Sequence, residues 1–255
     1  MSSHIWTPVE LSSELKRYDG RIWRVVEAQH YVSNRKLVDN RAEQELLEFL
    51  IEETKPAIPE ECSHLDLLLA TPFRYGAIYP KGSRFRRAGR TLGVFYASEE
   101  LGAAIAEMAF FRLLFFAESP TTPWPANPAD YACFMAAVAS PRSLDLTKPP
   151  LVRDRATWTD PIDYGPCRVL ADAARAADAE IIRYESVRDP KRRANVAVLK
   201  CAAFAKPQPI DLRAWRIRLS ATGAQAFCEA TQEWIEFDRM TFAADPRIAA
   251  MAWER

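Results

Sequence analysis

Residues 93–118, GVFYASEELGAAIAEMAFFRLLFFAE, decide the fold more than any other stretch of this chain. The aromatic and β-branched residues of 93–97 predict a short strand. Ser98 with two glutamates after it is typical of a helix start, because serine caps free backbone N–H groups and acidic residues favour the positive end of the helix dipole. The apolar run 101–117 then predicts a helix to about Glu118. Two charges interrupt this run, so it is a poor membrane span and a good buried helix.

Glu107 differs from the rest of this helix because nothing beside it on the helix can neutralise its charge. Its neighbours three and four positions away are alanines and phenylalanines, so no local ion pair forms. A buried unpaired carboxylate is costly, and a cation or a hydroxyl from elsewhere in the chain should therefore meet it. Position alone leaves two interpretations open. Glu107 is a functional carboxylate in a cleft, or it lies at the exposed edge of the helix or in a structural ion pair.

The other predicted elements mix helices and strands without the regular alternation of a doubly wound sheet. Apolar periodicity predicts a helix at 41–54, and it includes Leu46, Leu47, Phe49 and Leu50 in its apolar stripe. Further helices are predicted at 165–177 and 222–230, and strands at 21–28, 131–139, 180–184, 195–204 and 214–219. This order favours an α+β fold in which helices pack on mixed sheets.

Length and charge limit the classes of protein to which the chain can belong. With 255 residues, 49% of them hydrophobic, it can bury a sizeable core, and no linker or low-complexity tract divides it. We therefore expect a single domain. The 34 basic and 34 acidic side chains cancel, whereas a nucleic-acid binder usually carries a basic excess. We expect no direct binding of nucleic acid, and a local basic site remains open.

The cysteines and histidines predict neither a disulfide framework nor a metal site. The five cysteines are odd in number and widely spaced without a CxxC pair, so free thiols in a cytoplasmic protein are expected. His4, His30 and His64 lack ligand spacing and a neighbouring acidic cluster. The N-terminus has no secretory pattern, and no GxSxG motif supports a catalytic triad. We expect a cytoplasmic protein without a metal.

Three further segments have a functional and a structural interpretation. Residues 81–90 hold five cations and two glycines, which suit a phosphate site or a solvated basic loop, with neither Walker nor Rossmann spacing. Residues 73–75, Phe-Arg-Tyr, place a cation between rings that suit a nicotinamide or a nucleobase, or that belong to the core. Residues 183–190, RYESVRDP, place a hydroxyl in a turn near cations, which is also ordinary turn chemistry.

The order of these segments resembles the RES family. The similar motifs are ATPFRY (70–75), GSRF (82–85), GVFYAS (93–98), AIAE (104–107), RYESVRDP (183–190) and NVAVL (195–199). On this resemblance the chain is one RES-type domain over 1–255. Its core lies at about 65–204, with an N-terminal extension at 1–64 and a C-terminal flank at 205–255.

The resemblance implies which residues form the site. Its catalytic residues fall on Arg74, Glu107 and Ser186, and its NAD-binding residues fall on Tyr75, Arg84 and Tyr96. In these roles the glutamate stabilises the cationic ribose and the arginines hold pyrophosphate or incoming phosphate. The tyrosines stack on nicotinamide, and the serine positions the ribose or the nucleophile.

Two points of this assignment stay open. Arg24 in RIWRV competes with Arg74 as the first arginine of the family, and we prefer Arg74 because Tyr75 follows it and GSRF comes soon after. Glu185 departs from the family pattern, in which a small residue precedes the serine. Its effect on the charge of the site is therefore open.

The resemblance implies an NAD-cleaving toxin with a fold similar to ADP-ribosyltransferase toxins. NAD is then a substrate in a cleft, with no prosthetic group and no metal. The expected reaction is phosphorolysis of the nicotinamide–ribosyl bond, and the alternatives in the same cleft are NAD hydrolysis and ADP-ribosylation of a protein. The alternative of another class is a non-enzymatic nucleic-acid-binding module. Expected partners are NAD, phosphate and an antitoxin with a helix-turn-helix domain, through which the toxin oligomerises, and no membrane.

Overall fold

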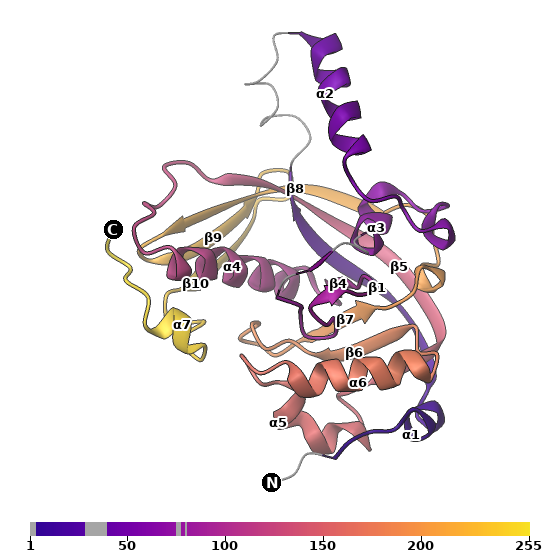
Figure 1. The fold of residues 1–255 in the computed structure, drawn as a ribbon. Coiled ribbons are helices and arrows are strands. Elements are labelled where there is room, and N and C mark those ends of the chain that lie inside the picture. Colours follow the sequence, from indigo (N-terminus) through magenta and orange to yellow (C-terminus); the bar gives the residue numbers. More distant parts are fainter. Residues whose placement is uncertain (1–3, 29–39, 75–77, 80) are drawn as a thin grey trace.

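The computed structural model describes residues 4–28, 40–74, 78–79 and 81–255 (Figure 1). The helices are α1 (Pro8–Ser13), α2 (Arg41–Glu53), α3 (Leu67–Ala70), α4 (Leu101–Glu118), α5 (Arg155–Trp158), α6 (Gly165–Ala176) and α7 (Pro246–Ala249), with 3-10 turns at Glu60–Cys62, Thr71–Phe73, Leu151–Asp154 and Cys201–Ala203. The strands are β1 (Lys16–Glu27), β2 (Ile78–Tyr79), β3 (Gly89–Arg90), β4 (Phe95–Ser98), β5 (Ala129–Asp145), β6 (Ile181–Glu185), β7 (Ala194–Val198), β8 (Asp211–Ser220), β9 (Gly223–Cys228) and β10 (Glu233–Asp238).

Eight of these strands form one sheet in the order β1-β4-β7-β6-β5-β8-β9-β10. A further antiparallel pairing of β1 with β5 closes β1, β4, β7, β6 and β5 into a ring and leaves β8–β10 as a wing. β5 and β6 run parallel, whereas β5 and β8 are antiparallel. The sheet is therefore mixed, and the predicted α+β class is confirmed.

The long strand β5 makes the branching of the sheet possible. One edge pairs with β1 from Tyr131 to Ser143. On its other edge, residues 129–135 pair with β8 and residues 143–145 pair with β6. The two halves of one strand thus belong to the wing and to the ring, so a strand predicted only at 131–139 organises the whole sheet.

The helix α4 is buried along most of its length, as its sequence predicts. Its buried residues join one apolar cluster with β1, the wing and the C-terminal segment, and Phe110 meets Phe242 edge-on at 5.9 Å between ring centroids. Burying a side chain of this size contributes about 1.5–3 kcal/mol. In Figure 1, α4 lies against the wing and α6 lies beside β6. α4 therefore has a fixed position between wing and ring.

Three local predictions are wrong. Residues 222–230 are not a helix but contain β9, in which Ala224, Ala226 and Cys228 are buried and alternate with half-buried residues, the period of a strand. Ser98 does not cap α4, since the N-cap is Glu100 and Ser98 ends β4. The strand predicted to Phe204 ends at Val198, before a 3-10 turn.

In contrast, α2 closely matches its predicted helix and stands away from the body of the protein (Figure 1).

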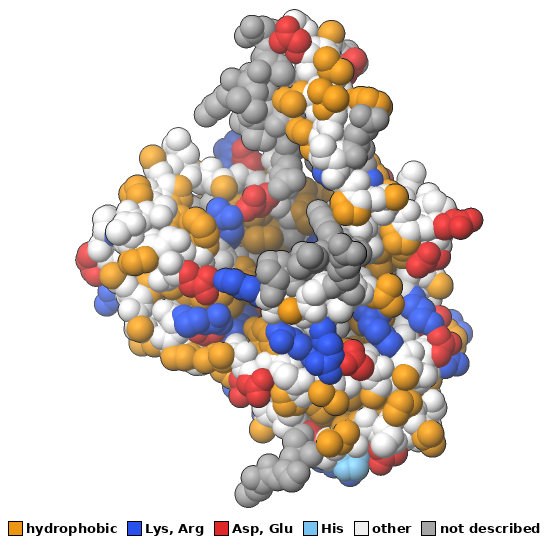
Figure 2. Space-filling view, viewed as in Figure 1, with side chains coloured by type: hydrophobic (Ala, Val, Ile, Leu, Met, Phe, Trp, Pro, Cys, Tyr) orange, Lys and Arg blue, Asp and Glu red, His pale blue; other side chains and the backbone are white. Residues whose placement is uncertain are grey.

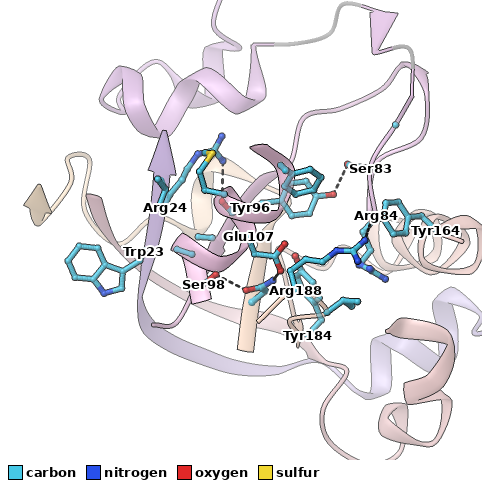
Figure 3. A pocket seen from close by; sticks show the side chains of 18 residues that line it. Trp23, Arg24, Ser83, Arg84, Tyr96, Ser98, Glu107, Tyr164, Tyr184 and Arg188 are labelled. Atoms are coloured by element: carbon cyan, nitrogen blue, oxygen red, sulfur yellow. Dashed lines mark hydrogen bonds between the residues drawn. The ribbon is translucent and has the colours of Figure 1, made fainter. Parts of the chain in front are cut away.

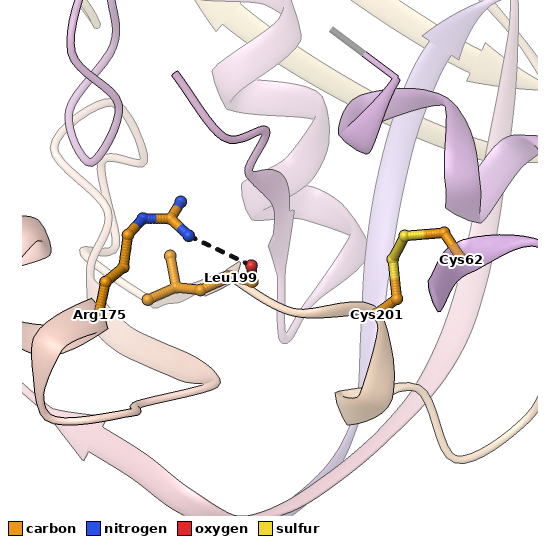
Figure 4. Close-up of a disulfide and its surroundings, with 4 residues drawn as sticks. All are labelled: Cys62, Arg175, Leu199 and Cys201. Carbon is orange, nitrogen blue, oxygen red and sulfur yellow. Dashed lines mark hydrogen bonds between the residues drawn. A yellow bond between two sulfur atoms is a disulfide. The ribbon is translucent and has the colours of Figure 1, made fainter. Parts of the chain in front are cut away.

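The expectation that all five cysteines are free thiols is also wrong. Cys62 and Cys201 form a disulfide between two 3-10 turns, with their Cα atoms 5.3 Å apart (Figure 4). They are 139 residues apart in sequence, so no local motif could indicate the pairing. Cys133, Cys167 and Cys228 are free and buried. No helix in the described ranges is both long and apolar enough to span a membrane.

Candidate active site

A cavity of about 390 Å³ lies where β1, β4 and α4 meet the loop before Phe85 and the residues around β6 and β7 (Figure 3). Its volume is within the range of small-molecule sites. Basic side chains form a band across the middle of the face seen in Figure 2. The cavity is lined by Trp23, Arg24, Val25, Gly82, Ser83, Arg84, Tyr96, Ala97, Ser98, Ala104, Glu107, Met108, Phe111, Tyr164, Tyr184, Val187, Arg188 and Asn195.

Glu107 reaches this cavity from the middle of α4, and two neutral donors hold its carboxylate. The Ser186 hydroxyl and the Asn195 side-chain amide both donate to Oε1, each at 2.6 Å. Within the described chain no cation pairs with Glu107, and Oε2 has no hydrogen-bond partner. The expectation that a distant hydroxyl meets this carboxylate is confirmed. One oxygen is held by the protein, and the other is available to a ligand.

Ser186 acts on Glu107 from behind the cavity wall. Its Oγ accepts hydrogen bonds from the backbone N–H groups of Arg188 at 3.3 Å and Asp189 at 3.0 Å, which is the turn chemistry of a serine before an Asp-Pro pair. With its lone pairs occupied, the hydroxyl proton points at Glu107. Ser186 is fully buried and is not part of the cavity lining. This placement favours a positioning role over contact with substrate.

Asn195 is a site residue that the sequence analysis missed. It pairs with Ser98 across β4 and β7, and the buried Ser98 hydroxyl donates to Asn195 Oδ1 at 2.6 Å. This bond orients the amide so that its nitrogen faces Glu107. Asn195 is a buried polar residue within the apolar strand Ala194–Val198. A lone amide in such a strand was the signal that could have identified it.

Of the two candidates for the first arginine of the family, Arg24 lines the cavity and the preferred Arg74 does not. Arg24 lies on β1 with its guanidinium 4.7 Å from the Phe95 ring centroid, and it donates to the Tyr96 carbonyl at 3.2 Å. No described carboxylate pairs with it, and burial lowers its pKa to about 10. Arg74 is buried at the end of a 3-10 turn outside the lining, and Tyr75 lies outside the described residues. Arg24 lies between Trp23 and Val25, and all three residues of β1 line the cavity, which proximity in sequence could not show.

Arg84 lines the cavity, but most of its contacts hold the wall together. It donates to the backbone carbonyls of Trp158 at 2.7 Å and Asp160 at 2.9 Å, and its guanidinium lies 4.5 Å from the Tyr164 ring centroid. Two of its five donors are thereby occupied. The guanidinium of Arg84 thus ties the basic loop to residues 158–164.

Arg188 is a second cavity residue that the sequence analysis did not assign to the site, although it belongs to the RYESVRDP segment. It forms an ion pair with Asp245 at 3.1 Å, and their side chains are 5% and 0% exposed. Its guanidinium lies 3.7 Å from the Phe110 ring centroid. Asp245 also caps α7. The C-terminal flank therefore supplies the charge that holds an arginine of the cavity wall.

Tyr96 lies between these arginines on β4. Its hydroxyl shares a hydrogen bond with the Ser83 hydroxyl at 2.8 Å and accepts one from the Phe85 N–H at 2.9 Å. These bonds anchor the basic loop against β4. Figure 3 shows Tyr96 and Glu107 in the middle of the site, with Arg24 on one side and Arg84 and Tyr164 on the other.

Two further charged residues near the site, Glu185 and Arg87, form ion pairs with residues outside the cavity lining. Glu185 makes a bidentate ion pair with Arg155, both bonds at 2.7 Å, and pairs with Arg192 at 2.9 Å. It is not part of the lining, so its departure from the family pattern leaves the cavity charge unchanged. In the basic loop, Arg87 pairs with Asp172. The loop is therefore not simply a solvated row of cations.

Comparison with models of known protein families identifies the family of this chain. The RES domain model matches residues 58–220, more than half of the sequence. The chain belongs to the RES domain family. The match includes the predicted core at about 65–204 and confirms the resemblance, and it covers Arg84, Tyr96, Glu107, Ser186 and Asn195. It leaves out Arg24, which lines the cavity, and Asp245, which holds the cavity residue Arg188, so both flanks contribute to the cavity, the C-terminal one indirectly.

Comparisons with solved structures and with curated proteins give weaker similarities than the family model. The RES domain described here has a TM-score of 0.47 and 13% sequence identity to a chain in the crystal structure of the M. tuberculosis MbcT–MbcA toxin–antitoxin complex. The alignment covers 80% of this chain and 90% of that chain. No curated protein matches the sequence significantly.

Proposed function

We propose that this RES protein is an enzyme that cleaves NAD between nicotinamide and ribose and transfers the ADP-ribosyl group to inorganic phosphate. The observation that carries the proposal is the Glu107 carboxylate, held through one oxygen by Ser186 and Asn195 and without a cation partner among the described residues. An unneutralised carboxylate in a partly enclosed cavity stabilises positive charge that develops beside it.

The chemistry of NAD cleavage needs this kind of group. The bond from the anomeric carbon to the nicotinamide nitrogen breaks, and its electron pair stays on the nitrogen. Positive charge moves from the ring to the ribose, where a carboxylate stabilises an oxocarbenium-like transition state. An oxygen of phosphate then bonds to the anomeric carbon, and the phosphate releases a proton. The products are neutral nicotinamide and ADP-ribose 1″-phosphate.

The direct test is incubation of the purified full-length chain with NAD, with and without phosphate, followed by mass spectrometry. We expect nicotinamide together with ADP-ribose 1″-phosphate, formed only when phosphate is present. Free ADP-ribose would identify a hydrolase, and a modified protein would identify an ADP-ribosyltransferase. Intact NAD would overturn the proposal. Salt-sensitive binding of nucleic acid with intact NAD would instead favour the non-enzymatic alternative.

Membership of the RES family also supports a place in a toxin–antitoxin pair. We expect a cytoplasmic toxin that depletes NAD and is neutralised by an antitoxin with a helix-turn-helix domain, through which it oligomerises. Expression of the chain alone should arrest growth and lower cellular NAD, and the Glu107→Ala variant should do neither. Growth arrest with unchanged NAD would separate toxicity from this reaction.

Loss of the Ser186 hydroxyl should slow the reaction without abolishing it. A hydrogen bond to a charged group is worth about 1.5–3 kcal/mol, and Asn195 still holds Glu107 in the Ser186→Ala variant. We expect kcat to fall about tenfold with little change in KM. Ser186→Thr, which keeps the hydroxyl, should recover most of the rate. A change in KM alone would instead indicate direct contact between Ser186 and NAD.

A further inference from the structure

The two ends of the cavity differ in how tightly the protein encloses them. The Arg84 end is formed by Arg84, Tyr164, Tyr184 and Arg188, and Tyr184 and both arginines are at most 7% exposed. The hydrogen bonds of Arg84 to Trp158 and Asp160 tie this wall together. It is therefore a rigid and enclosed end, suited to the smaller part of a substrate.

The Arg24 end is formed by Arg24, Met108, Phe111 and their neighbours on β1. An ion pair of 2.5 Å between Glu27 and Arg112 holds the α4 turn that carries Phe111 beside β1. Phe111 lines the cavity although the residue is 53% exposed. This end is therefore open and apolar at its rim, suited to the larger part of a substrate.

The arginines at the two ends also differ in the hydrogen-bond donors that they can offer to an anion. Asp245 neutralises the charge of Arg188. Arg84 has no described carboxylate partner, but it donates hydrogen bonds to two backbone carbonyls. Arg24 makes one carbonyl hydrogen bond, faces the Phe95 ring, and has no described carboxylate partner. A poorly solvated guanidinium without a counter-charge attracts an anion, and phosphate oxygens match its fork geometry. The guanidinium with more free donors for an anion is thus at the open end.

Resting on the proposed function, we infer the direction in which NAD binds. Nicotinamide enters the enclosed Arg84 end, the diphosphate meets Arg24, and the adenine stacks on Phe111 at the rim. The scissile bond then lies at Glu107, between the two ends (Figure 3). The cationic nicotinamide ring lies near Arg84, and cleavage relieves this repulsion because the ring leaves neutral. Phe111 is one helical turn from Glu107, about 6 Å along the axis, so it lies beyond the ribose.

The test compares NAD with nicotinamide mononucleotide, which has the same scissile bond but no adenylate part. Stacking of a base on an aromatic side chain is worth about a factor of ten or more, so Phe111→Ala should lower the ratio of kcat/KM for NAD to that for the mononucleotide about tenfold. Phe115→Ala is the matched control. Phe115 is an exposed phenylalanine one turn further along α4 that does not line the cavity, and its loss should leave the ratio unchanged.

Product inhibition gives a second measurement. In Phe111→Ala the inhibition constant of ADP should rise about tenfold, and that of nicotinamide should stay nearly constant. Equal losses on both substrates, or weaker inhibition by nicotinamide, would show the opposite direction and overturn this inference while leaving NAD cleavage intact. Should the wild-type chain release no nicotinamide, the proposed function fails. In that case, calorimetry of ADP binding to the wild type and to the Phe111→Ala variant still tests whether Phe111 contributes to binding of the adenylate part.

Discussion

Replacing Glu107 with alanine is expected to reduce nicotinamide release at least about 100-fold, the loss found when a strong electrostatic stabiliser of a transition state is removed. This loss corresponds to about 2.7 kcal/mol of transition-state free energy. The effect should be large because no other described carboxylate lines the cavity. Steady-state release of nicotinamide from NAD measures it, with the fall expected in kcat.

The matched variants for this prediction separate charge from packing. Glu107→Gln keeps the shape of the side chain and removes its charge, so it should lose nearly as much rate as alanine. Glu118→Gln removes a carboxylate from the end of the same helix, where the side chain is 47% exposed, and should leave the rate unchanged. A Glu107→Gln enzyme of nearly wild-type rate would remove the carboxylate from the mechanism.

Replacing Asp245 with alanine is expected to lower the free energy of unfolding by about 3–5 kcal/mol, the cost of leaving a buried charge without its partner. Both side chains of the Asp245–Arg188 pair are almost fully buried. Asp245 also accepts hydrogen bonds from the backbone and side chain of Arg247, and these are lost as well. Urea unfolding should show a lower midpoint with an unchanged m-value.

Two further variants test whether the burial of the pair causes this loss. Asp172→Ala breaks an exposed ion pair with Arg87, at 2.5 Å and with side chains 54% and 47% exposed, and should cost about 0–1 kcal/mol. The double variant Asp245→Ala, Arg188→Met removes the stranded charge and should regain part of the stability of the single variant. Equal losses for Asp245→Ala and Asp172→Ala would contradict a special cost of burial.

The candidate site could be predicted where one residue conflicts with its local surroundings. Glu107 in an apolar helix is such a residue, and the structure places it at the cavity, held by the hydroxyl of Ser186. Asn195 gives the same kind of signal in an apolar strand, but it was overlooked. The position of Arg24 could not be found in this way, because an arginine in a half-polar strand violates no local rule.

The fold could be predicted where a helical pattern or an apolar run extends over several turns. The helices α2, α4 and α6 begin and end within three residues of their predicted bounds, because an apolar stripe in α2, an apolar run in α4 and the alanines of α6 each extend over several turns. The helix predicted at residues 222–230 was wrong because a short apolar run fits a helix and a strand equally well. Pairing with β8 and β10 makes this segment the strand β9.

By itself, the sequence determined the mixed α+β class, the RES family, the buried helix α4 and the carboxylate at its centre. Only the tertiary structure decided that Arg24 replaces Arg74 at the cavity, that Cys62 joins Cys201, and that Asp245 holds Arg188. The physical reason is the range of the interactions. Helix and strand periodicity depends on residues a few positions apart. The pairs at the site and in the disulfide join segments separated by 57 to 139 residues, which only the closure of the sheet brings into contact.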